Sequence, residues 1–273
     1  MPSIPCVLTI AGSDPCGASG VQSDLNVIRD FGLYPASALT AIVWQNTQGV
    51  GGWSAVGAQA VALQAQAVLE DLDVRAIKLG MLPDAQTVEA VAQVVARARA
   101  ARPTWVVCDP VLASGDARVA LASQGVVDAM KAHLLEHVDV LTPNVPEAQA
   151  LEPTAMATGS QKARALARAL GVGVLLKAGH WEQAEGEPVL RDWWSDSAGR
   201  THELEAHPRI EQDVRGTGCQ LSSAIACGLA QGHAPLLAIE RARAYLAHML
   251  TLRARVGRGR MVVARVGEPL DLF

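Results

Sequence analysis

The sequence Val7-Leu8-Thr9-Ile10-Ala11 runs directly into Gly12-Ser13-Asp14-Pro15-Cys16-Gly17-Ala18-Ser19-Gly20 and then into residues 20–31, whose apolar positions recur every three or four residues. A short apolar run predicts a buried strand, and the three-to-four spacing predicts a helix. The glycines and small side chains between them allow a ligand to approach the backbone closely. This part of the chain is therefore predicted to form a strand, a ligand-accessible turn and a helix. A plain strand-to-helix turn is the alternative.

The same alternation continues along the chain. Further buried strands are predicted at Ala76–Leu79, Trp105–Cys108, Val138–Leu141 and Val172–Lys177. Helices are predicted at Val56–Leu72, Asp84–Ala100, Gln124–His137, Gln161–Leu170, Cys219–Ala230 and Pro235–Arg255. Such alternation predicts a mostly parallel α/β sheet with helices on both faces. The polar segment Glu182–Pro208 breaks the rhythm and is predicted to form irregular strands or a hairpin.

Composition limits the function classes. The chain has 273 residues, of which 50% are hydrophobic, and no linker-like stretch, so a single domain over residues 1–273 is expected. A net charge of −4 gives no reason to expect nucleic-acid binding. Between Glu240 and Glu268, however, seven arginines occur at positions 241, 243, 253, 255, 258, 260 and 265, which predicts a solvated helix face or an edge that faces polyphosphate.

The expected location is the cytoplasm. Five cysteines without CxxC spacing are typical of a reducing compartment. The first residues lack the basic and apolar regions of a signal peptide, so no export signal is expected. Apolar runs shorter than the roughly 20 residues of a membrane span predict no membrane partner.

Polar residues that follow the predicted strands are candidate site residues, because ligands of open α/β sheets bind beyond the carboxyl ends of the strands. Asp109 directly follows Cys108 and suits either Mg²⁺ with nucleotide phosphates or an Asp-Pro turn. Lys177 ends its strand and either reaches solvent or carries charge to a transferring phosphoryl group. Asn144 and Glu147 have the spacing of a helix capping box, which is a structural role.

Two further segments have side chains or backbone groups suited to ligands. Gln45 follows the apolar stretch Ala36–Trp44, and its amide, which donates and accepts, either reads the edge of a nitrogen heterocycle or caps a loop. Gly216-Thr217-Gly218-Cys219 precedes a helix, so its free backbone N–H groups and the helix dipole favour an anion. A flexible loop before an ordinary helix is the alternative. Cys219 in the first helical turn is expected to have a lowered thiol pKa.

Taken in order, these blocks resemble the hydroxymethylpyrimidine and phosphomethylpyrimidine kinases of thiamine biosynthesis, in the ribokinase-like superfamily. The resemblance extends from Leu8 to about Leu252. Its most specific blocks are Ala11-Gly12-Ser13-Asp14-Pro15, Gln45-Asn46-Thr47, Lys78-Leu79-Gly80-Met81-Leu82, Asp109-Pro110-Val111, Thr142-Pro143-Asn144 and Gly216-Thr217-Gly218-Cys219.

The resemblance implies a three-layer αβα fold and ATP-dependent phosphorylation of 4-amino-5-hydroxymethyl-2-methylpyrimidine, followed by phosphorylation of its monophosphate. It implies ATP and Mg²⁺ as cofactors and a homodimer. The pyrimidine pocket would be formed by Gly12, Asp24, Gln45 and Met81. Asp109 and Glu147 would hold Mg²⁺. Catalysis would rest on Lys177, Gly216, Gly218 and Cys219. The nucleotide would contact Asn144, Thr217, Lys177 and Arg215.

The sequence departs from the family pattern in three places. The segment 109–115 is shorter than usual and has no lysine, Trp44 replaces a small residue and is expected to reshape the pocket, and Arg215 replaces a frequent histidine. Two alternatives follow: a pyridoxal kinase with the same phosphate machinery, or a ligand-binding protein of this fold that has lost catalysis. Gln45 and Cys219 favour the pyrimidine.

Overall fold

The computed structural model describes residues 4–113, 119–153, 159–177, 189–208 and 214–265. Within them a nine-stranded sheet has the order β10-β9-β7-β6-β5-β4-β1-β2-β3. The neighbouring strands from β7 to β2 are parallel, whereas β3, β9 and β10 each pair antiparallel with a neighbour. The bounds of these nine strands are β1 Cys6–Ser13, β2 Tyr34–Asn46, β3 Gly49–Ala55, β4 Val74–Leu79, β5 Trp105–Cys108, β6 Val140–Leu141, β7 Gly173–Lys177, β9 Asp192–Ser195 and β10 Thr201–Glu203.

Two small pairs of strands lie outside this sheet. They are β8 (Val189–Leu190) with β11 (His207–Pro208), and β12 (Arg253–Ala254) with β13 (Val262–Val263). The helices are α1 Gly20–Asp30, α2 Ala58–Asp71, α3 Ala85–Ala101, α4 Val126–Ala129, α5 Val145–Leu151, α6 Gly159–Leu170, α7 Thr217–Ala230 and α8 Pro235–Thr251. A π-helical turn, Met130–Leu134, and a 3-10 turn, Leu135–His137, continue α4.

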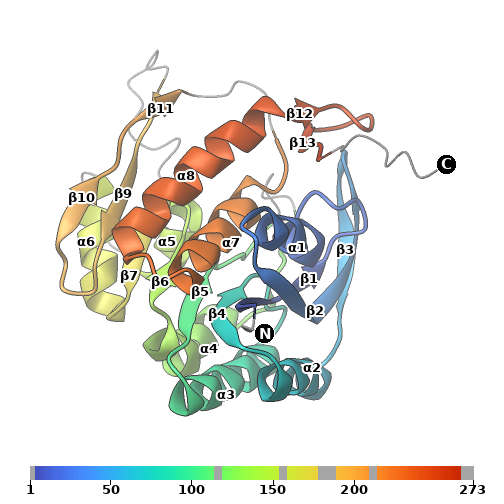
Figure 1. Ribbon diagram of the computed structural model, residues 1–273, viewed down its shortest axis with the longest axis vertical. Helices are drawn as coiled ribbons and strands as arrows, with labels where there is room; N and C mark the ends of the chain where they lie inside the picture. The colour runs from blue at the N-terminus through green and yellow to red at the C-terminus, as the bar shows by residue number, and fades with distance from the viewer. Residues whose placement is uncertain (1–3, 114–118, 154–158, 178–188, 209–213, 266–273) are drawn as a thin grey trace.

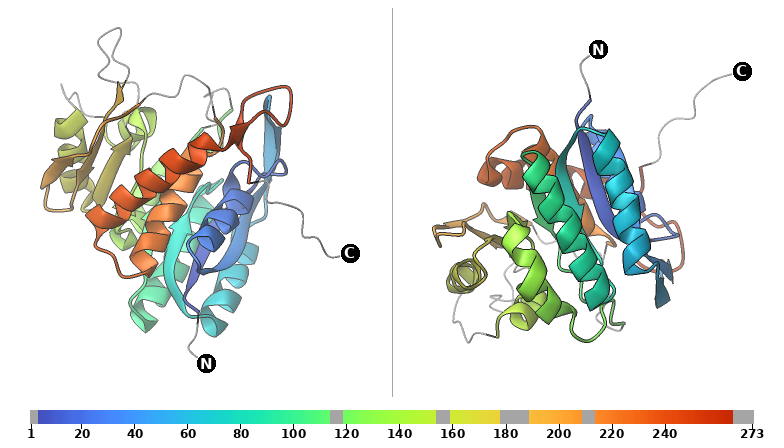
Figure 2. Two further views of the ribbon diagram at one scale, coloured as in Figure 1. Left: turned by 45° about the horizontal axis from the view of Figure 1, so that its top comes forward. Right: turned by 90° about the horizontal axis from the view of Figure 1, so that it is seen from below.

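The sheet lies between two helical layers because alternate side chains of each strand enter different cores. In β1, Leu8 and Ile10 belong to one core, which α2 to α6 cover, whereas Val7 belongs to the other, which α1, α7 and α8 cover. Figures 1 and 2 show α1, α7 and α8 together on one side of the sheet and α2 and α3 on the other. The predicted α/β fold with a mostly parallel sheet is confirmed.

Most predicted elements are present, but two strands were not predicted. The segment Glu182–Pro208 contains the predicted hairpin, as β9 and β10, although its residues up to Pro188 lie outside the described part. The sequence did not identify β2 and β3 as strands. β3 is a poor strand sequence, with glycines at positions 49, 51 and 52, and is held in place by its pairing with β2.

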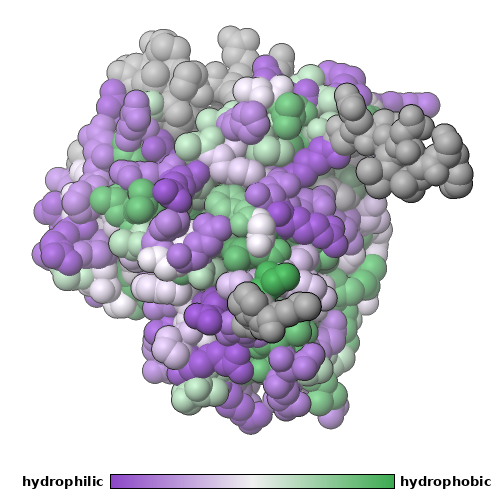
Figure 3. Space-filling view, viewed as in Figure 1, coloured by the Kyte–Doolittle hydropathy of each residue, from purple (hydrophilic) through white to green (hydrophobic). Residues whose placement is uncertain are grey.

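The arginines near the C-terminus do not form one charged edge. Arg243 contacts Asp192, Arg265 contacts Asp30, and Arg241 lies on the exposed side of α8. Figure 3 shows hydrophilic side chains spread over this face of the molecule, with hydrophobic ones in small separate groups. A solvated helix face therefore describes Arg241, whereas Arg255 and Arg258 are exposed beyond the end of α8. Arg260 is different, because it reaches the cavity described next.

Candidate active site

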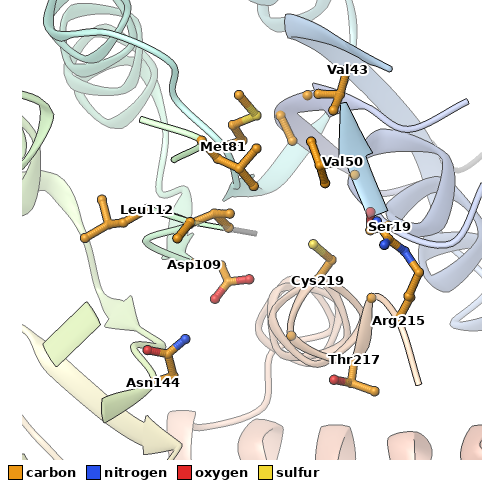
Figure 4. A pocket seen from close by; sticks show the side chains of 18 of the residues that line it. Ser19, Val43, Val50, Met81, Asp109, Leu112, Asn144, Arg215, Thr217 and Cys219 are labelled. Atoms are coloured by element: carbon orange, nitrogen blue, oxygen red, sulfur yellow. The ribbon is translucent and has the colours of Figure 1, made fainter. Parts of the chain in front are cut away.

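A cavity of about 620 Å³ lies where the carboxyl ends of the central strands meet the N-terminus of α7. Its walls come from segments far apart in sequence, as the labelled side chains in Figure 4 show. One end is apolar and the other is charged. The sequence-predicted residues that line it are Gly12, Gln45, Met81, Asp109, Asn144, Glu147, Lys177, Arg215, Gly216, Thr217, Gly218 and Cys219.

The charged end is built around an ion pair. Lys177 Nζ, at the end of β7, lies 2.8 Å from Asp109 Oδ1, and the Thr142 hydroxyl donates to the same oxygen at 3.0 Å. Burial alone would raise the pKa of Asp109, but Lys177 and Lys78 outweigh burial and hold it below its ordinary value. Burial likewise opposes the charge on Lys177, yet Asp109 and Glu147 raise its pKa. Both groups are therefore charged at neutral pH.

The N-terminus of α7 faces this ion pair. A Cβ added to Gly218 would lie 3.3 Å from Lys177 Nζ and 3.4 Å from Asp109 Oδ2, so the helix backbone is close to both charges. Gly216, the N-cap residue, has φ = 77°, and a Cβ there would come 1.8 Å from the Ala18 carbonyl oxygen. Because the first N–H groups of a helix have no partner within it, this end is suited to bind an anion.

Cys219 lies in the first turn of α7, as predicted, but its thiol pKa does not fall. Burial raises the pKa of Cys219 to about 11, although Lys78 and the Gly20 backbone amide act in the opposite direction. The expectation of a lowered pKa was wrong, because it considered only the helix dipole and not the loss of water around the sulfur.

Asn144 and Glu147 form the predicted capping box. Asn144 Oδ1 accepts from the Glu147 backbone N–H at 2.9 Å, and the Asn144 backbone N–H donates to Glu147 Oε2 at 2.8 Å. Both residues also line the cavity, so the structural role does not exclude a role in binding. Burial raises the pKa of Glu147 to about 7, although Lys177 acts in the opposite direction. No group of three potential metal-binding side chains occurs within the described ranges.

The other end of the cavity is apolar except for one side-chain amide, that of Gln45. Val43, Val50 and Met81 form its wall, and Gln45 lies beside them. A Cβ on Gly12 would approach Met81 Sδ to 3.2 Å, so a glycine keeps this wall open.

Two expected positions were wrong. Asp24 does not line the cavity: it is fully buried beneath it, where it accepts from Lys78 Nζ at 2.8 Å and from the Thr9 and Ser223 hydroxyls. Trp44 does not reshape the cavity either. Side chains alternate along β2, so Trp44 lies on the face opposite Gln45, packs on Gly51 and Gly52, and is 53% exposed.

Arg215, expected to contact the nucleotide, lines the cavity directly before the N-terminus of α7, and its guanidinium donates to Gln45 Oε1. The nucleotide contact stays a prediction. The departure noted at 109–115 is described only as far as Ala113, and Ser114 and Gly115 lie outside the described residues.

Sequence reasoning missed four polar residues of the wall, Ser13, Ser19, Lys78 and Arg260. A lysine inside the apolar strand sequence of β4 was a signal for Lys78, because a buried charge needs a partner. Arg260 belonged to the arginine-rich stretch, for which a polyphosphate-facing edge was one of the two interpretations.

Known proteins resemble this chain over most of its length. The family model described as phosphomethylpyrimidine kinase matches residues 14–264. The hydroxymethylpyrimidine/phosphomethylpyrimidine kinase of Streptomyces coelicolor is 36% identical over 93% of this chain and 92% of its own length. The thiamine biosynthesis bifunctional protein ThiED of Geobacter sulfurreducens is 38% identical over 93% of this chain, which spans half of that longer protein.

Solved structures agree with the fold. A Clostridium difficile phosphomethylpyrimidine kinase has a TM-score of 0.75 and 26% identity, covering 91% of this chain and 100% of that one. The pyridoxal kinase of Staphylococcus aureus in complex with ADP has a TM-score of 0.82 and 26% identity, covering 96% and 94%. The fold is the three-layer arrangement of the ribokinase-like kinases. From the family match and the sequence identities, the chain belongs to the phosphomethylpyrimidine kinase family.

Proposed function

We propose that this protein transfers the γ-phosphoryl group of ATP to the hydroxymethyl group of 4-amino-5-hydroxymethyl-2-methylpyrimidine, and then to the monophosphate, in thiamine diphosphate biosynthesis. The observation that carries the proposal is one cavity with an apolar, amide-bearing end and a cationic, anion-binding end. The names of the relatives from Streptomyces coelicolor and Rhizobium meliloti describe the same two phosphorylations.

The charged end supports phosphoryl transfer by neutralising charge. The transition state of such transfers is loose, so positioning and electrostatics contribute more than a strong base. Lys177 and the backbone amides of Gly216, Gly218 and Cys219 would stabilise the negative charge on the transferring group. Because the Cys219 thiol is neutral at physiological pH, its sulfur would contribute little as a base. Asn144 and Thr217, which line the same end, would contact the nucleotide.

Mg²⁺ would be held at this end by Asp109 and Glu147. Two carboxylates fit a hard cation that prefers oxygen ligands and keeps several of its waters. Asp109 Oδ1 accepts hydrogen bonds from Lys177 and Thr142. Asp109 Oδ2 faces Gly218, so this second oxygen is the one directed toward the N-terminus of α7. When bound, the ion would neutralise charge on the nucleotide phosphates.

A direct comparison of substrates tests the function. ADP release is measured with MgATP and, in parallel, the pyrimidine alcohol, its monophosphate and pyridoxal. We expect turnover with both pyrimidines, with kcat/KM for the alcohol above that for pyridoxal. The reverse preference would identify a pyridoxal kinase, an activity that the similarity to the Staphylococcus aureus enzyme makes the second candidate. No turnover with any of the three would indicate a binding protein.

Gln45→Leu tests the assignment of the two ends. Since Gln45 lies at the apolar end, its loss should raise KM for the pyrimidine and leave KM for ATP unchanged. Equal changes in both constants would show a structural role for Gln45.

A homodimer in the cytoplasm is also part of the proposal. Tyr34, Ile42 and Trp44 of β2 are about half exposed, at 51%, 48% and 53%, and offer apolar surface to a second copy. All five cysteines are free, which supports a reducing compartment. In the part of the chain that the structure describes, no helix is both long and apolar enough to span a bilayer. Sedimentation equilibrium tests the oligomeric state.

A further inference from the structure

The Gln45 amide is held between two partners of opposite hydrogen-bonding character. Arg215, which is 7% exposed, donates to Gln45 Oε1, and Gln45 Nε2 donates to Ser19 Oγ at 3.4 Å. Ser19 and Arg215 lie next to each other on the cavity wall, as Figure 4 shows. A guanidinium has only donors, so the amide atom that faces Arg215 has to be the oxygen.

The partner on the other side imposes the same orientation. The Ser19 hydroxyl donates its single proton to Asp14 Oδ2 at 2.8 Å, and therefore only accepts from Gln45. Asp14 is 1% exposed and also accepts from the Ser19 and Cys16 backbone amides at 2.9 Å, so its own position is fixed. If the Gln45 amide were flipped, its NH₂ group would face the donors of Arg215 and its oxygen would face the acceptor oxygen of Ser19. Both hydrogen bonds would then be lost.

We propose that Arg215 is a positioning residue that fixes the polarity of the Gln45 amide and so selects a 4-aminopyrimidine edge over a 4-oxopyrimidine edge. An amide has two acceptor and two donor positions, of which Arg215 and Ser19 each use one. The oxygen keeps one acceptor position and the nitrogen keeps one donor position. They match an exocyclic NH₂ group next to an unprotonated ring nitrogen. A 4-oxopyrimidine has a carbonyl next to a ring N–H, the reverse pattern.

The inference rests on the proposed function, and its test separates the two. The ratio of kcat/KM for 4-amino-5-hydroxymethyl-2-methylpyrimidine to that for its 4-oxo analogue is measured in the wild type and in Arg215→Gln, Arg215→Lys and Ser19→Ala. Glutamine both donates and accepts, so Arg215→Gln allows the Gln45 amide to flip, and the ratio should fall about 10- to 100-fold, the scale of one hydrogen bond to a charged group. Lysine only donates, so Arg215→Lys should keep the ratio within about threefold of the wild type.

Ser19→Ala removes the acceptor on the other side and should also lower the ratio, which keeps the proposal testable if Arg215→Gln does not fold. Arg97→Gln, an exposed change on α3, is the matched control and should leave the ratio unchanged. The proposal is overturned if the wild type shows no preference, if Arg215→Gln keeps the wild-type ratio, or if Arg215→Lys loses as much of it as Arg215→Gln.

Failure of the wild type to phosphorylate the 4-amino alcohol would refute the proposed function instead. In that case, the dissociation constants of the two pyrimidines, measured by calorimetry in the same variants, replace the kinetic ratio. The same fall in Arg215→Gln would then support the polarity of the amide, and equal binding of both pyrimidines by the wild type would refute it.

Discussion

Lys177 Nζ and Asp109 Oδ1 are 2.8 Å apart although 68 residues separate them in the chain. They meet because β5 and β7 flank the same strand, β6, in a parallel sheet, so their carboxyl ends lie at the same edge. The N-terminus of α7 lies against this pair, with Gly218 close to both side chains. This arrangement puts a cation, a carboxylate and free backbone amides around one point, and it leads to the first prediction.

Lys177→Ala should lower kcat/KM about 100-fold or more, the scale for losing a donor that stabilises transition-state charge. Steady-state ADP release with the pyrimidine alcohol measures the effect. Lys131→Ala removes a lysine side chain that is 40% exposed and does not line the cavity, and it serves as the control. A loss of less than threefold in Lys177→Ala would remove this residue from the chemistry.

Cys219→Ala should cost less than about tenfold in kcat/KM, equivalent to roughly 1.4 kcal/mol. The reason is that burial raises the pKa of Cys219 to about 11, so the thiolate is scarce at neutral pH. The measurement is the pH dependence of kcat/KM in both proteins. A much larger loss, together with disappearance of an ionisation from the profile, would show that the sulfur acts as the base.

Gly216→Ala should mainly lower the stability of the protein, whereas Gly218→Ala should mainly lower its activity. At Gly216, the positive φ and the contact with the Ala18 carbonyl oxygen strain any side chain, so the free energy of unfolding should fall by at least about 2 kcal/mol. At Gly218 the new methyl group meets only Lys177 and Asp109 atoms at 3.3 and 3.4 Å, so activity should fall more than stability. Chemical denaturation and kinetics measure the two effects.

Gly17→Ala is the control for this pair, because Gly17 has φ = 72° but open space around its Cβ position. It should show the cost of the backbone conformation alone, about 1–2 kcal/mol. If Gly216→Ala is no less stable than Gly17→Ala, the close contact with Ala18 is not a determinant of the fold.

In the absence of Mg²⁺, Glu147→Gln should raise the free energy of unfolding, and the increase should be larger at pH 8 than at pH 5. Burial raises the pKa of Glu147 from 4.5 to about 7, so the folded state binds a proton that the unfolded chain releases. Stability from this group is therefore present below pH 4.5 and is lost as the pH rises to about 7. Glutamine avoids that loss, which is up to about 3 kcal/mol, and still accepts the Asn144 N–H.

Denaturation curves at pH 5 and pH 8 measure this difference, and Glu136→Gln, at an exposed carboxylate, is the comparison. Equal stability changes at both pH values would mean that Glu147 titrates as it does in the unfolded chain. The same Glu147→Gln variant should lose activity if this carboxylate holds Mg²⁺.

Asp24→Asn should lower the free energy of unfolding by about 3–5 kcal/mol, because it leaves Lys78 buried without its charged partner. Both side chains are fully buried in the folded protein. KM for the pyrimidine should change little in the folded fraction, since Asp24 lies beneath the cavity. Asp128→Asn, at an exposed position of α4, is the control. A normal stability with a raised KM would instead show that Asp24 contacts the substrate.

The amino-acid pattern alone determined the layers of this protein and the ends of its central strands. Short apolar runs and three-to-four spacing identify buried strands and helices, because both depend on local periodicity. The capping box at Asn144 and Glu147 and the glycines before α7 were visible for the same reason, since a cap or a positive φ is a property of a few consecutive residues. Pairing decided β3, which local sequence does not favour.

Tertiary structure decided which of the candidate side chains share one space and what charge each carries there. Asp24 was expected in the cavity and lies under it, because Lys78, Thr9 and Ser223 converge on its carboxylate from three separate segments. Arg215 donates to Gln45, 170 positions earlier in the chain, and burial reversed the expected pKa shift of Cys219. Desolvation and hydrogen bonding between distant segments depend on the packed fold, so no local sequence pattern contains them.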